Sequence, residues 1–331
     1  MIISKTPYRV SFFGGGTDFP SWSKIHGGQV LSTTINKYCY ISCRYLPSFF
    51  EHKFRFVYSV IETVKNINDI QHPTAKAVLA ELKIKDGLEI HYDGDLPARS
   101  GLGSSSAFTV GLLNALYGLR GHRITKKELS LESIRIEQEV VKENVGCQDQ
   151  IAIAHGGLNV IKFLENGEYR IEPIITPRAR YESFQSHLML FFTGVSRISS
   201  EIALDMINNI GYREKEIKLI GTYVDEGINI LTDENRNLIE FGSLLNETWK
   251  VKKSLSRQIS NSKIDSIYNK AVQAGAIGGK ILGAGGGGFI LFFVEPEKQE
   301  LVKKALSSLV YVPVNFERQG SQIILYEPEG F

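Results

Sequence analysis

The pattern of hydrophobic and polar positions predicts a first half in which strands and helices alternate. Residues 2–13, 29–45 and 54–60 are rich in β-branched and aromatic side chains and are separated by turn-forming residues, which favours strands. Residues 72–84 have apolar side chains at helical spacing and predict a helix. Residues 88–94 predict a further strand, which leads into a glycine-rich loop.

Two longer helices and a hairpin follow this loop in the pattern. Residues 104–119 predict a long helix, with Gly121 just beyond its end. Thr125, followed by Glu128, indicates a capping box for a helix that runs through Val141. A hairpin is expected after this helix, over residues 157–175 with its turn at 165–168.

The pattern in the second half of the chain predicts fewer strands than in the first half, together with a mainly helical region. Polar residues 176–186 lack a clear period, so we expect the domain boundary there. The elements predicted beyond it are a strand at 187–195, three or four helices between 199 and 274, a strand at 289–294, a helix at 296–309 and strands at 311–316 and 322–326. The expected fold class is α+β, with an N-terminal mixed α/β nucleotide-binding domain (1–180) and a C-terminal α+β domain (181–331).

Composition narrows the possible partners. The 331 residues are 43% hydrophobic and 22% charged, as in a globular protein, and the net charge of +2 gives no reason to expect nucleic acid or a membrane as a partner. The N-terminus lacks the apolar stretch of a signal peptide, so we expect a cytoplasmic protein. Three cysteines suit a reducing compartment, and Cys39 and Cys43 are expected to be buried hydrophobes.

The candidate chemistry begins in the glycine- and serine-rich loop before the long helix. Gly101 and Gly103 permit a tight turn and a close backbone approach to a ligand. The serines at 104–106 then begin a helix whose free N–H groups favour a phosphate. A serine that merely caps a helix is the alternative for so short a motif.

Three motifs in order carry a resemblance that covers nearly the whole chain. They are TPYRVSFFGGGTDFP (6–20), LPARSGLGSSSA (96–107) and KILGAGGGGF (280–289), and together they resemble the GHMP kinase superfamily. A P-loop is excluded because Gly279–Lys280 is followed by Ile281. The formal dinucleotide fingerprint at 283–288 leads into a strand rather than a helix and is a false match.

The resemblance implies an ATP- and Mg²⁺-dependent kinase. The implied phosphate-binding residues are Gly101, Leu102, Gly103, Ser104, Ser105 and Ser106. Glu137 would bind magnesium together with the Ser105 hydroxyl, and Asp149 would orient or deprotonate the acceptor hydroxyl. Arg9 would sit beside Asp149 and stabilise transferred charge. The neighbouring Glu139 and Glu143 have no motif support and are expected to be ordinary surface residues.

The acceptor is implied by departures from galactokinase. Gly15 and Gly16 replace the Glu and His of the galactokinase motif, so galactose is not expected. The first motif, GCQDQ (146–150) and TGVSR (193–197) instead resemble the heptose 7-phosphate kinases of this family, with L-fucose kinases as the nearest alternative. The implied substrate-binding residues are Gly15, Gly16, Thr17, Asp18, Arg197, Gly285 and Gly286.

Such an enzyme would phosphorylate the anomeric hydroxyl of a sugar phosphate, toward nucleotide-activated heptose for surface polysaccharide, and a homo-oligomer is possible. A catalytically inactive sugar-sensing protein is the alternative of another class. The intact serines, Glu137 and Asp149 argue against that alternative.

Overall fold

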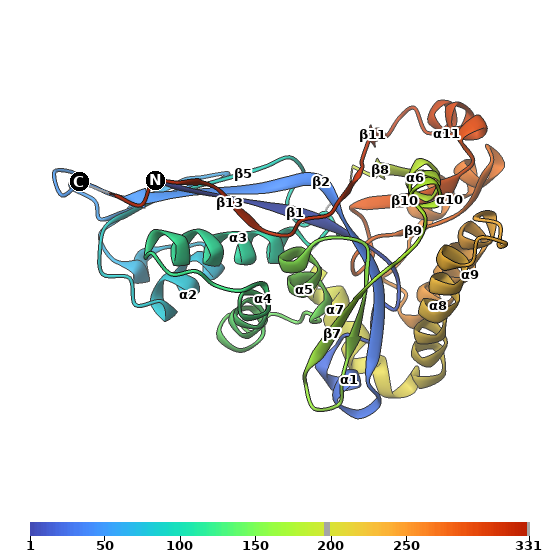
Figure 1. Cartoon of the computed structure of the whole chain (residues 1–331), viewed down its shortest axis with the longest axis horizontal. Coiled ribbons are helices and arrows are strands. Elements are labelled where there is room, and N and C mark those ends of the chain that lie inside the picture. The colour runs from blue at the N-terminus through green and yellow to red at the C-terminus, as the bar shows by residue number, and fades with distance from the viewer. Residues whose placement is uncertain (195–198, 330–331) are drawn as a thin grey trace.

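Two β-sheets organise the computed structural model, which describes residues 1–194 and 199–329 (Figure 1). The first is a nine-stranded sheet with the main order β13-β1-β2-β5-β3-β4, to which β12 and the β6–β7 hairpin add along β2. Its strands are β1 (Ile2–Phe13), β2 (Gly28–Tyr45), β3 (Phe54–Val57), β4 (Ile61–Val64), β5 (Leu88–Gly94), β6 (Asn159–Phe163), β7 (Tyr169–Pro173), β12 (Phe316–Glu317) and β13 (Gln322–Tyr326). The second, antiparallel sheet has the order β11-β8-β10-β9, from β8 (Leu188–Phe192), β9 (Ala276–Ile281), β10 (Phe289–Val294) and β11 (Val310–Val312).

Helices cover one face of the first sheet. They are α2 (Pro73–Glu81), α3 (Ser104–Leu119), α4 (Lys126–Arg135) and α5 (Gln148–His155), which lie on the same side of β1 and β2 in Figure 1. Helix α3 packs centrally because its side chains are buried almost all round. Helix α4 begins at the expected Thr125–Glu128 capping box and continues as a π-helical turn over Ile136–Val140.

The remaining helices include α9 (Ile239–Leu255) and α10 (Ser262–Gln273), which pack on the second sheet. The others are α1 (Pro20–His26), α6 (Arg178–Ser186), α7 (Ser199–Asn209), α8 (Glu214–Thr232) and α11 (Gln299–Ala305). Helices α8 and α9 form an antiparallel pair at one side of the molecule (Figure 1). Helix α9 packs on β9, while α8 reaches across to β1 and β2 of the first sheet.

Aromatic side chains join the two halves in one core. Phe12 on β1 packs against Phe184 and Phe241, with ring centroids 5.4 and 5.5 Å apart, and Phe13 lies 4.8 Å from Phe241. Phe241 also approaches Phe293 of the second sheet, at 6.0 Å. All five rings are fully buried, so the end of β1 is stabilised by residues from beyond position 180.

The mixed α+β class and the major predicted strands and helices are confirmed. The polar stretch at 176–186 instead contains helix α6, which anchors itself through buried Phe184. Strands β12 and β13 return to the first sheet, so its strands come from both sides of residue 180. The division at that residue stays a prediction.

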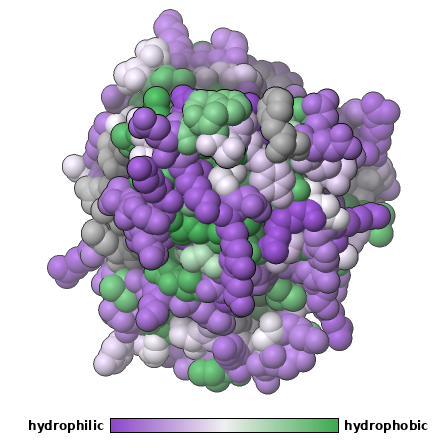
Figure 2. All heavy atoms as spheres, turned by 90° about the vertical axis from the view of Figure 1, so that its left-hand side faces the viewer, coloured by the Kyte–Doolittle hydropathy of each residue, from purple (hydrophilic) through white to green (hydrophobic). Residues whose placement is uncertain are grey.

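Among the described residues, the surface at the end of the molecule where both termini lie has no large continuous hydrophobic patch in Figure 2. Figure 2 shows that hydrophilic side chains cover most of this face and that hydrophobic ones appear in separate groups. None of the helices within 1–194 and 199–329 is long and apolar enough to cross a membrane. Cys39 and Cys43 are buried free thiols, as expected.

Candidate active site

The glycine- and serine-rich loop joins β5 to α3 and lies against the third motif. Gly101 and Gly103 adopt φ angles of 82° and 76°, in the left-handed region that favours glycine. A Cβ on Gly283 would lie only 2.6 Å from Gly101 Cα, so the two loops touch backbone to backbone. The Ser104 hydroxyl accepts a hydrogen bond from the Arg99 amide at 2.9 Å, which closes the loop rather than capping the helix. The first N–H groups of α3 therefore have no side-chain cap in the described structure.

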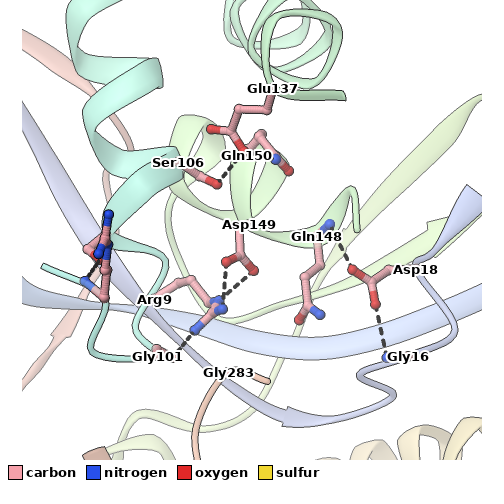
Figure 3. Close-up of polar contacts among 12 residues, drawn as sticks. Arg9, Gly16, Asp18, Gly101, Ser106, Glu137, Gln148, Asp149, Gln150 and Gly283 are labelled. Carbon is pink, nitrogen blue, oxygen red and sulfur yellow. Dashed lines mark hydrogen bonds and ion pairs between the residues drawn. The ribbon is translucent and has the colours of Figure 1, made fainter. Parts of the chain in front are cut away.

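Arg9 and Asp149 form a two-point ion pair next to the loop (Figure 3). Arg9 Nε donates to Asp149 Oδ1 at 2.7 Å and Nη2 donates to Oδ2 at 2.6 Å. Arg9 Nη1 also donates to the Gly101 carbonyl at 2.7 Å. The Arg9 side chain is 5% exposed and that of Asp149 22%, so the carboxylate remains open to the cavity while its orientation is fixed.

Glu137 is a buried carboxylate behind the first turn of α3. Its Oε2 accepts hydrogen bonds from Ser106 Oγ at 3.0 Å and from Gln150 Nε2 at 2.6 Å. Its Oε1 is buried and has no hydrogen-bond partner among the described residues. Burial raises the pKa of Glu137 to about 7, more than the hydrogen bonds around it lower this pKa.

The first motif builds the opposite wall around Asp18. Asp18 Oδ1 accepts from the Gly16 amide at 3.0 Å and Oδ2 from the Gln148 amide at 3.3 Å (Figure 3). Burial, and secondarily the charge of Asp149, raise the pKa of Asp18 although these amides lower it. Gly146 is required here, because a Cβ at that position would lie 1.8 Å from Asp18 Oδ2.

One cavity of about 820 Å³ is lined by the glycine- and serine-rich loop, which we call the phosphate loop, by the Arg9–Asp149 pair and by Asp18. Four aromatic side chains that pack together, Tyr58, His72, Tyr92 and Phe108, also line it and suit a flat heteroaromatic ring. Ala203 and Met206 of α7 line it as well. The size and lining of this cavity fit a nucleotide-sized ligand together with a second small ligand.

Comparison with known proteins identifies the family. The GHMP kinases N terminal domain model matches residues 64–157 and the GHMP kinases C terminal model matches residues 230–312. The chain belongs to the GHMP kinases. It is an ATP-dependent kinase, and the first of these models spans the phosphate loop.

Individual relatives cover almost the whole of this GHMP kinase. D-glycero-alpha-D-manno-heptose 7-phosphate kinase of Campylobacter jejuni is 29% identical over 320 residues, 92% of this chain and 93% of the relative. The structure of a D-glycero-D-manno-heptose 1-phosphate kinase from Bacteroides thetaiotaomicron superposes with a TM-score of 0.72 at 26% identity, over 97% of this chain and 98% of that one. Lactococcus lactis galactokinase, at 18% identity and a TM-score of 0.75 over 97% of this chain and 94% of that one, shares the fold.

The structure brings most of the expected site residues of this kinase together. Those in the cavity wall are Arg9, Gly15, Gly16, Asp18, Gly101, Gly103, Ser104, Ser105, Ser106 and Asp149. Thr17 is instead buried, with its hydroxyl 2.8 Å from the Gly14 carbonyl and 2.9 Å from that of Gln29. Leu102 is buried and receives the Arg9 amide on its carbonyl.

Other expected residues take different positions. Glu137 lies behind Ser106 rather than in the cavity wall. Gly285 and Gly286 pack against Ile259, and the third motif instead presents Gly283 and Ala284 to the cavity. Arg197 lies outside the described residues.

Sequence reasoning missed several cavity residues of this kinase. Glu143, expected on the surface, is half-buried in the wall, and burial raises its pKa. Lys252 and Lys280 are buried there, and both left a signal in the sequence. Lys280 is the one charged residue of strand β9. Lys252 interrupts the buried stripe of α9 formed by Phe241, Leu245, Thr248, Trp249 and Leu255.

Proposed function

We propose that this kinase transfers the γ-phosphoryl group of Mg-ATP to the anomeric hydroxyl of D-glycero-D-manno-heptose 7-phosphate, giving the 1,7-bisphosphate. The observation that supports it most is the Arg9–Asp149 pair, in which Arg9 of the first motif is also bonded to Gly101 of the phosphate loop. A hydroxyl placed there would lie at the junction of a nucleotide site and an acceptor site. The Campylobacter jejuni and Bacteroides thetaiotaomicron relatives, both named as heptose phosphate kinases, favour this acceptor.

Asp149 would act on the acceptor hydroxyl. Arg9 binds both carboxylate oxygens and is itself fixed to Gly101, so Asp149 has a set orientation without a substrate. The carboxylate would accept a hydrogen bond from the hydroxyl and receive its proton as the new bond to phosphorus forms. The Arg9 guanidinium would stabilise the negative charge on the transferred group.

The residues around Glu137 fit a magnesium ion. The buried Oε1 of Glu137 has no hydrogen-bond partner among the described residues and could serve as an oxygen ligand. Ser105, which precedes the Ser106 that bonds Glu137, is exposed at the cavity wall. No group of three His, Cys, Asp or Glu side chains suited to a metal occurs in the described part of the chain, and magnesium bound with nucleotide phosphates needs fewer protein ligands. The ion would neutralise charge on the phosphates.

The proposal is tested by turnover with three acceptors. Purified protein and Mg-ATP are incubated with D-glycero-D-manno-heptose 7-phosphate, with the unphosphorylated heptose and with L-fucose, and ADP release is followed. ³¹P NMR then locates the new phosphate. Asp149→Asn is expected to lower kcat by about 10²–10⁴-fold, because the oriented proton acceptor is lost. Glu139→Gln, a change at an exposed carboxylate of the turn over Ile136–Val140, is the control and should retain activity.

Each outcome decides a separate part of the proposal. Preferential turnover of the heptose 7-phosphate at the anomeric position supports the whole assignment. Preferential turnover of L-fucose keeps the Asp149 mechanism and rejects the acceptor. An Asp149→Asn variant as active as Glu139→Gln rejects the role of Asp149.

A further inference from the structure

Two buried lysines line the same cavity as Arg9 and have no role in the mechanism above. Lys252 comes from α9 and Lys280 from β9, with only 8% and 4% of each residue exposed. Lys280 Nζ donates one hydrogen bond, to the Phe12 carbonyl at 2.8 Å. Lys252 Nζ lies 2.5 Å from the Gly283 carbonyl and 3.3 Å from that of Ile281. An ammonium group has three donors, so both lysines keep donor capacity beyond these carbonyls.

The nearby carboxylates are hydrogen-bonded to other groups than these lysines. Asp149 is bound at both oxygens by Arg9, and Asp18 accepts from two backbone amides. Among the described residues neither lysine forms an ion pair with a carboxylate. Burial, and secondarily repulsion from Arg9, lower the pKa of Lys252 to about 8 although the charge of Asp18 raises it, and burial with repulsion from Lys252 and Arg9 lowers the pKa of Lys280 well below its usual value. A buried cationic pair of this kind is stabilised by an anion.

The position of Lys280 points to the acceptor rather than to the nucleotide. Strand β1 contacts the phosphate loop at Arg9, whose amide donates to the Leu102 carbonyl at 3.0 Å. Ser11 follows on the same face of the strand, and Lys280 reaches the next carbonyl, that of Phe12. Lys280 therefore lies farther along β1 than the loop does, toward Gly15 and Asp18. Lys252 instead lies beside Gly283, which contacts the loop at Gly101.

The hydroxyl of Ser11, between Arg9 and Phe12 on β1, has no hydrogen-bond partner in the described structure. Ser11 is 94% buried and lines the cavity. With Lys252 and Lys280 it offers two cations and a hydroxyl, which together can bind the oxygens of a phosphate group.

We propose that Lys252, Lys280 and Ser11 bind a phosphate ester already carried by the acceptor, which selects an anionic sugar over a neutral one. The inference rests on the proposed kinase function and deepens it, since it assigns the residues that recognise the second phosphate. These three residues come from α9, β9 and β1, so the phosphate would hold both sheets of the protein around the substrate.

The test is the selectivity ratio, kcat/KM for D-glycero-D-manno-heptose 7-phosphate divided by kcat/KM for the unphosphorylated heptose. Lys280→Met and Lys252→Met are expected to lower this ratio by roughly tenfold to a hundredfold each, the usual effect of losing a charged hydrogen bond. Ser11→Ala is the milder variant and should lower it by a smaller factor. Lys250→Met is the matched control on α9, because Lys250 is exposed and pairs with Glu247.

The outcomes separate this inference from the proposed function. A ratio that falls in the lysine variants and stays unchanged in Lys250→Met supports the phosphate site. Equal losses with both sugars would overturn it and assign the lysines to the transferred phosphoryl group or to folding, which thermal unfolding of each variant distinguishes. Wild-type protein that phosphorylates neutral sugars as efficiently as the phosphorylated heptose would overturn the inference while leaving the kinase intact. Wild-type protein without turnover would instead reject the proposed function.

Discussion

At the scale of single residues, the Glu137 carboxylate is buried in a place where its negative charge is unfavourable unless a cation is bound. The group is 1% exposed, yet one of its oxygens has no partner among the described residues. Burial raises its pKa from 4.5 to about 7, so the folded protein binds this proton more tightly than the unfolded chain does. Ionised Glu137 is therefore costly until a cation accompanies it.

This shift predicts a pH-dependent loss of stability in the absence of magnesium. Between about pH 4.5 and 7 the folded state holds more protons than the unfolded state, so the free energy of unfolding falls as pH rises through that window. The expected loss from this group is on the order of 3 kcal/mol. Glu137→Gln should remove this loss. Urea unfolding of wild type and variant at pH 5 and pH 7.5, in EDTA, would measure it as the difference in the free energy of unfolding between the two pH values.

The Glu137→Gln variant should also separate stability from activity. We expect it to be more stable than wild type at pH 7.5 and to lose most Mg-ATP turnover, because a neutral amide is a poor magnesium ligand. Glu139→Gln, on the exposed side of the same turn, should follow the wild type in both measurements. Equal pH dependence in Glu137→Gln and wild type would contradict the buried-carboxylate explanation.

At the scale of elements, the phosphate loop depends on the third motif for its shape. Gly283 and Gly121 both have φ of 69°, but only Gly283 has a close neighbour, Gly101. Gly121→Ala should cost about 1–2 kcal/mol for the left-handed backbone alone. Gly283→Ala adds an overlap at 2.6 Å and should cost roughly 1–3 kcal/mol more.

The pair of alanine variants isolates the contact between the loops. Gly283→Ala should also lower kcat/KM for ATP by roughly tenfold or more, because the phosphate loop would shift relative to Arg9. Gly121 follows the opposite end of α3 from the loop and has no described neighbour within 4 Å of an added Cβ, so Gly121→Ala should leave kcat/KM for ATP near the wild-type value. Similar unfolding free energies and similar kinetics in the two variants would show that the close approach is unimportant.

The sequence predicted those elements whose pattern is local. Helix α3 and strands β1 and β2 have long apolar patterns and punctuating glycines, and their bounds match closely. Helix α5 was not predicted, because its eight residues have only a weak apolar period, although it positions Asp149. The motifs located Arg9 and Asp149. Lys252 and Lys280 were visible as charged interruptions of apolar segments, but that both reach one cavity depends on the packing of α9 on β9 and β1 and on the contact of Lys280 with Phe12, which no local pattern contains.

At the scale of the whole molecule, the C-terminal segment completes the first sheet. Strand β13 pairs with β1, and β12 pairs with β2. Between them the Ser321 amide donates to the Ile153 carbonyl of α5 at 3.1 Å, and the Ser321 hydroxyl lies 2.7 Å from that of Thr6. The last strands thus contact both α5, which carries Asp149, and β1, which carries Arg9.

This arrangement predicts that residues 1–180 do not fold alone, although they contain the phosphate loop, Arg9 and Asp149. The fragment would lack β12 and β13 and would expose the rings of Phe12 and Phe13, which in the whole chain pack on Phe184 and Phe241. We expect the fragment to show no cooperative thermal transition, whereas the full chain unfolds in one main transition. Coexpression with residues 181–331 should restore cooperative unfolding, since all contacts are then available. A sharp transition in the isolated fragment would instead show that the first sheet is an autonomous domain and that its C-terminal strands are dispensable.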